Sequence, residues 1–83
     1  MTEHVRAFDV AYAAALEEGV APSAMLDALD ANIRVYVEMI GTAWYHRNGP
    51  AKAVARNILR AYARKLREAR AWRNCLIGRM ATI

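Results

Sequence analysis

Cysteine and histidine are nearly absent from this chain of 83 residues, which contains one cysteine and two histidines. The single thiol, Cys75, excludes an internal disulfide, and the distant positions of His4 and His46 form no metal-binding spacing. We therefore expect neither a metal site nor a cofactor. A domain this short buries only about 60% of its unfolded surface, so helix packing and self-association are the stabilisers that remain.

Long apolar runs are also missing. No stretch approaches the roughly 18 consecutive apolar residues of a membrane span, and the first residues contain no apolar run typical of a secretory leader. A lone thiol is compatible with a reducing compartment. We expect a cytoplasmic protein with no membrane partner, and its small size and richness in Ala and Arg favour a bacterial or phage source.

Acidic residues are scarce in the second half of the chain. Residues 1–42 hold seven acids and two bases, which gives a net charge of −5, whereas residues 43–83 hold ten bases and one acid, Glu68, which gives +9. The overall charge of +4 conceals this division. Such asymmetry indicates a polyanionic partner or an electrostatic association between copies.

Glycine and proline, four and two in number, divide the chain into three helical segments. The first runs from about residue 3 to 18, with Thr2 as its N-cap and Gly19 as its stop. Its apolar positions recur at helical spacing, and they are Val5, Phe8, Tyr12, Ala15 and Leu16.

The second segment starts near Pro22, which suits a first helical turn. We expect it to continue through Gly41 to about His46, although a glycine within a helix costs about 1 kcal/mol relative to alanine; a break at Gly41 is the alternative. Its main apolar stripe is Met25, Leu26, Leu29, Ile33, Tyr36, Val37 and Ile40, and Trp44 continues it to close the core. A second face holds Ala24, Ala28, Ala31, Val35 and Met39. An apolar arc this wide predicts two neighbours, so this helix should be the central one.

The third segment follows the turn Asn48-Gly49-Pro50 and runs from residue 50 to about 80. Its apolar stripe is Val54, Ile58, Leu59, Tyr62, Leu66, Ala69, Trp72, Leu76 and Met80. Unbroken, it is about 46 Å long, whereas a compact domain of this size is roughly 30 Å across. Either it breaks near Asn74 or its end packs on a second molecule. We expect the latter, a homodimer whose interface is Trp72, Leu76, Ile77 and Met80.

The resulting fold prediction is an all-α bundle in which two shorter helices pack on a long, basic third one, a single domain over residues 1–83. On that helix six cations project within an arc of about 120° and span about 27 Å. We call them the arginine face: Lys52, Arg56, Arg60, Arg64, Arg67 and Arg70. The planar arginine fork binds phosphate or carboxylate through paired hydrogen bonds.

Three functions are compatible with this face. The first is a non-enzymatic module that engages nucleic acid or a nucleic-acid-associated complex through phosphates. The alternative is an adaptor or inhibitor that docks on an acidic protein surface, and the third is a solvated face without a partner. Tyr45, His46 and Arg47 could add a contact by stacking on a base or anchoring a protein. The sequence offers no nucleophile–base pair or phosphate loop, so we expect no enzyme and no small-molecule substrate.

Overall fold

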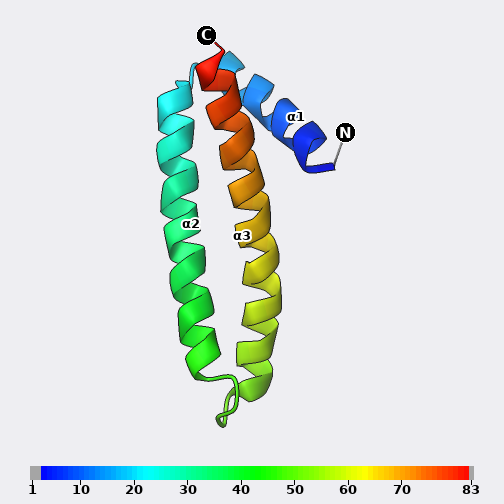
Figure 1. The fold of residues 1–83 in the computed structure, drawn as a ribbon, viewed down its shortest axis with the longest axis vertical. Helices are drawn as coiled ribbons and strands as arrows, with labels where there is room; N and C mark the ends of the chain where they lie inside the picture. The colour runs from blue at the N-terminus through cyan, green and yellow to red at the C-terminus, as the bar shows by residue number, and fades with distance from the viewer. Residues whose placement is uncertain (1–2, 83) are drawn as a thin grey trace.

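In the computed structural model, which describes residues 3–82, the chain forms three α-helices and no strand. They are α1 (Glu3–Glu17), α2 (Pro22–Tyr45) and α3 (Lys52–Ala81). Figure 1 shows α2 and α3 as a long antiparallel hairpin, with α1 beside the end of α3 that lies away from the turn. The predicted all-α bundle is confirmed. Within these residues, no helix combines the length and apolarity that a membrane crossing requires. Thr2 and the side chain of His4 lie outside the described part.

The end of α1 is set by Gly19, as the sequence predicts. Gly19 has a φ of 82°, a left-handed conformation that glycine adopts without steric cost. Its N–H donates to the carbonyl of Leu16 and the next N–H, of Val20, donates to that of Ala15, both at 3.0 Å. These two bonds form a Schellman motif, which satisfies carbonyls that the helix end leaves free.

The second helix continues through Gly41 and ends at Tyr45, so the alternative of a break there is wrong. Most of its main apolar stripe faces α3, although Val37 is exposed. Near the middle of the hairpin the rings of Tyr36 and Tyr62 lie 5.7 Å apart, and Ala43 and Ala55 are buried close to the turn. The two helices therefore pack along most of their length.

The third helix begins at Lys52, two residues later than predicted, because Pro50 still belongs to the turn. There the N–H of Lys52 donates to the carbonyl of Gly49 at 3.1 Å. From Lys52 the helix runs for 30 residues without a break near Asn74. The molecule measures 50 × 25 × 21 Å, so it is elongated, and the long helix fits because the body is not compact.

The central helix is α3, in agreement with the prediction of two shorter helices packed on the third, whereas the expectation that the second helix is the central one is wrong. Phe8 of α1 is buried and packs edge-on against Trp72, with ring centroids 6.1 Å apart. Leu76 is 0% exposed, and Asp9 of α1 forms an ion pair with Arg79. α1 packs mainly on α3 because its apolar face meets large side chains there, Trp72 and Leu76. On α2 the same face meets the smaller side chains of Ala24 and Ala28.

Trp44 does not close the core, contrary to the sequence prediction. It is 57% exposed, and Val37 and Val54 are also exposed although both belong to predicted core stripes. Near the turn the hairpin has only two helices, since α1 lies at the opposite end (Figure 1). Near the turn, the apolar faces of α2 and α3 are therefore covered only by each other and remain partly exposed.

Candidate nucleic-acid interface

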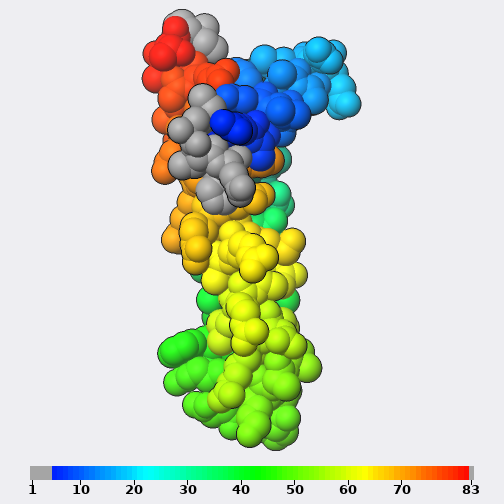
Figure 2. Space-filling model, turned by 90° about the vertical axis from the view of Figure 1, so that its right-hand side faces the viewer, coloured from blue at the N-terminus to red at the C-terminus, as the bar shows by residue number. Residues whose placement is uncertain are grey.

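The arginine face lies on one side of α3, as helical geometry requires. All six of its side chains are exposed. Figure 2 looks onto the side of α3 that is turned away from α2, and α1 crosses only its upper end. The part of α3 that carries most of these cations, drawn from green to yellow, is open to view below α1. The sequence-predicted residues are thus brought together along one helix.

Ion pairing separates the arginine face from the other arginines of α3. Arg73 Nε donates to Asp30 Oδ1 at 2.6 Å, which ties α3 to α2, and Arg79 pairs with Asp9 of α1. None of the six cations of the face makes an ion pair or a side-chain hydrogen bond with another described residue. Their donors are therefore available to an external anion.

The spacing within the face makes the charges repel one another. Neighbours four residues apart, such as Arg56 and Arg60, lie about 6 Å apart along the axis, and like charges at this spacing destabilise an isolated helix. Glu68 is the single acid of α3. A bound polyanion would relieve this repulsion, and high salt would screen it.

The predicted contact group, Tyr45, His46 and Arg47, does not form one surface. Arg47 folds back over the ring of Trp44, 3.9 Å from its centroid, and its Nη1 donates to the Trp44 carbonyl at 2.6 Å. Tyr45 and His46 meet edge to face at 5.0 Å, and Tyr45 is 82% exposed. Sequence reasoning missed the exposed Trp44–Arg47 pair. The sequence does contain an indication of this pair, because Trp44 and Arg47 are three residues apart and this spacing places two side chains on neighbouring helical turns.

The predicted dimer residues lie largely under α1. Trp72 and Leu76 pack inside the chain, Met80 is half-buried, and Ile77 is exposed. α1 therefore covers Leu76 and part of Trp72, whereas Ile77 stays exposed. Leu76 in particular has no surface to offer a partner.

Other chemistry-bearing groups are few among residues 5–82. Cys75 is a free thiol of intermediate burial, and no cluster of three or more metal-ligating side chains occurs in this range. No protein-family model, curated protein or solved structure matches the chain significantly.

Proposed function

We propose that this protein is a non-enzymatic binding module whose arginine face engages nucleic acid or a complex that contains it. One contrast carries the proposal. Arg73 and Arg79 are ion-paired, whereas the six cations of the arginine face are exposed and have no ion pair with any described residue. A helix that needed these charges only for its own stability would be expected to pair them with acids at i+4.

The mechanism is recognition of phosphates. Guanidinium groups donate paired hydrogen bonds to phosphate oxygens, and a stripe of about 27 Å runs alongside many phosphates, because each strand carries one per 3.4 Å of axis. Binding releases condensed counterions and is independent of sequence. Base readout is not part of the proposal, since α3 is a long hairpin arm rather than a short recognition helix after a tight turn.

The test is fluorescence anisotropy with labelled duplex DNA, duplex RNA and single strands, each titrated at several salt concentrations. If all six cations contact phosphates, the logarithm of the duplex binding constant falls with the logarithm of salt with a slope of about −5. Comparing the strands then identifies the preferred form of nucleic acid. Absence of binding to every probe at low salt, where attraction is strongest, would overturn the proposal.

A charge-matched pair of double variants makes this test specific. Arg60→Glu with Arg67→Glu reverses two charges on the arginine face, and Arg6→Glu with Arg34→Glu reverses two exposed charges on α1 and α2. The first variant should reduce the salt slope by at least about two units, since each phosphate contact contributes about one. The second should leave the slope unchanged. Equal losses would mean that net charge, not the face, drives binding.

A second candidate, an adaptor that docks on an acidic protein surface, is favoured by Trp44. This residue is exposed and held by Arg47, and tryptophan and arginine are typical anchors of protein interfaces. Under this alternative Trp44→Ala abolishes binding to a protein partner, because hot spots concentrate the energy. Under the nucleic-acid proposal Trp44→Ala leaves the salt slope intact.

We further propose that the protein is cytoplasmic and that it works as a homodimer. The lone thiol, Cys75, fits a reducing compartment. The dimer needs an interface other than the one around Leu76, since that residue is fully buried within the chain.

A further inference from the structure

One side of the hairpin carries an apolar seam on both helices. On α2 its members follow one another at intervals of three and four residues, the spacing of a helix-packing seam. We call the uncovered part the open groove: Met39 and Thr42 of α2 with Val54 and Ile58 of α3, which line a hollow together with His46, and Ala31, Val35 and Ala61, which helical spacing places on the same side. All seven side chains are uncharged, and Val35 and Val54 are 52% and 60% exposed. The arginine face lies roughly 140° around α3 from this groove.

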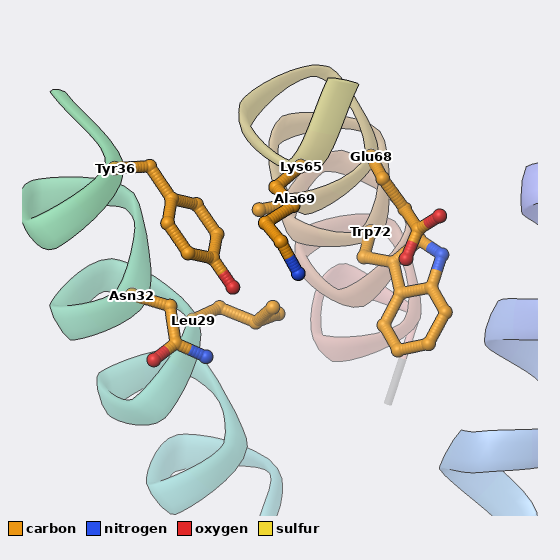
Figure 3. Close-up of a pocket in the computed structure, with 7 residues that line it drawn as sticks. All are labelled: Leu29, Asn32, Tyr36, Lys65, Glu68, Ala69 and Trp72. Carbon is orange, nitrogen blue, oxygen red and sulfur yellow. The ribbon is translucent and has the colours of Figure 1, made fainter. Parts of the chain in front are cut away.

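Three hollows follow this side of the hairpin. The upper one, of about 270 Å³, lies between all three helices and is lined by Phe8, Ala24, Ala28 and Leu76 among others. The middle one, of about 150 Å³, contains Lys65 and Glu68. Figure 3 shows the side chains of Tyr36 and Lys65 directed into the space between the two helices there. The lower one, of about 120 Å³, lies in the open groove between Met39 and Val54.

The first helix covers only the upper part of this side. α1 has 15 residues and is about 22 Å long, whereas the 30 residues of α3 extend for about 45 Å. The docking of α1 also shows that a helix with an apolar face fits this side of the hairpin. Among residues 5–82, nothing covers the lower half.

The exposed area is larger than that of a compact monomer. A compact chain of 9.3 kDa exposes about 5,000 Å², whereas this one exposes 6100 Å². The surplus of about 1,100 Å² exceeds the roughly 800 Å² that each partner contributes to a standard interface. This surplus is spread over the whole elongated molecule, and the open groove is one part of it.

We propose that a second copy of this chain covers the open groove. Two hairpins related by a twofold axis overlap their lower halves in antiparallel orientation and form a four-helix bundle there. The small side chains Ala31 and Ala61 allow the helices to approach closely, and Val35 and Val54 fill the space between them. Each α1 stays at an outer end of the assembly, beyond the overlap, so it does not obstruct the partner.

A second copy suits this groove because a twofold interface brings the same patch together with itself. An uncharged apolar patch is complementary to its own copy, whereas the arginine face repels its copy. In this dimer both arginine faces lie outside the interface and are accessible. The dimer does not depend on the proposed nucleic-acid function and is tested without nucleic acid.

The test is sedimentation velocity with variants of two matched valines on α2. Val35 lies in the open groove, and Val37 lies about 160° away on the opposite side of the hairpin, where it is 46% exposed. The wild-type chain should sediment as a dimer at roughly 100 µM, where even a weak interface of standard size is populated. Val35→Asp should weaken dimerisation by at least roughly 100-fold, since each twofold interface would bury the carboxylate twice. Val37→Asp should leave the dimer intact.

Val54→Asp, on the other helix of the groove, repeats the test if Val35→Asp fails to fold, and circular dichroism verifies the helix content of each variant. Dissociation by either groove variant, with Val37→Asp still dimeric, supports the proposal. A wild-type monomer at roughly 100 µM, or equal dissociation by Val37→Asp, overturns it.

Discussion

At the residue scale, two glycines place opposite demands on the backbone. Gly19 holds a left-handed φ of 82° at the end of α1. Gly41 lies within α2, where an added Cβ would meet no atom within 4 Å. Gly19 needs the positive φ that glycine adopts without steric cost. Gly41 does not need it, and there glycine only increases the conformational entropy that is lost on folding.

Alanine at these two positions should therefore have opposite effects on stability. Gly19→Ala should lower the free energy of unfolding by about 1–2 kcal/mol, since a side chain is strained in the left-handed region. Gly41→Ala should raise it by about 0.5–1 kcal/mol. Urea denaturation monitored by circular dichroism measures both changes. The same sign for both substitutions would contradict the Schellman geometry of Gly19.

At the element scale, α1 is attached through a small set of contacts with the end of α3. Leu76→Ala should lower the free energy of unfolding by about 2–4 kcal/mol, because the residue is fully buried. The amides of α1 should also lose hydrogen-exchange protection before those of the hairpin centre. Leu59→Ala is the control, because Leu59 is a half-buried leucine elsewhere on α3. It should destabilise the hairpin without a selective effect on α1. Uniform loss of protection in both variants would show that α1 is not a separate unit.

The bounds of the helices and the packing of two shorter helices on the third could be predicted from the sequence, but the contacts through which α1 docks could not. Gly19, Pro22 and the turn around Gly49 act locally, through backbone angles that each residue type prefers, so one sequence suffices to place them. The place where α1 docks depends on how large side chains from distant segments fit. Phe8 against Trp72 is such a contact, and no local pattern specifies it. The exposure of Trp44 escaped prediction for the same reason, since it depends on where α1 docks.

The arginine face could also be predicted, because a 3.6-residue period alone places its members on one side. What the sequence could not reveal is which arginines are paired. Arg73 and Arg79 meet acids 43 and 70 residues away along the chain. Only the fold separates these structural cations from the ones that are free to bind.

At the scale of the whole molecule, the shape itself is testable. The Cα radius of gyration is 15.4 Å, whereas a compact chain of this length has a value of about 12 Å. Small-angle X-ray scattering of the monomeric Val35→Asp variant should give a radius near 15.4 Å and a maximum dimension near 50 Å. A radius of about 12 Å would mean that α1 or the hairpin folds into a more compact body.

The docking of α1 on the far end of α3 has a consequence for the order in which the chain is made. During synthesis α1 emerges before α3, but the residues that bury Phe8 and pair with Asp9 are Trp72, Leu76 and Arg79, in the last turns of α3. The hairpin of α2 and α3 needs only contacts across one turn. α1 therefore leaves the ribosome before the hairpin but docks after it, and its apolar side stays open to chaperones until the last turns of α3 have been made.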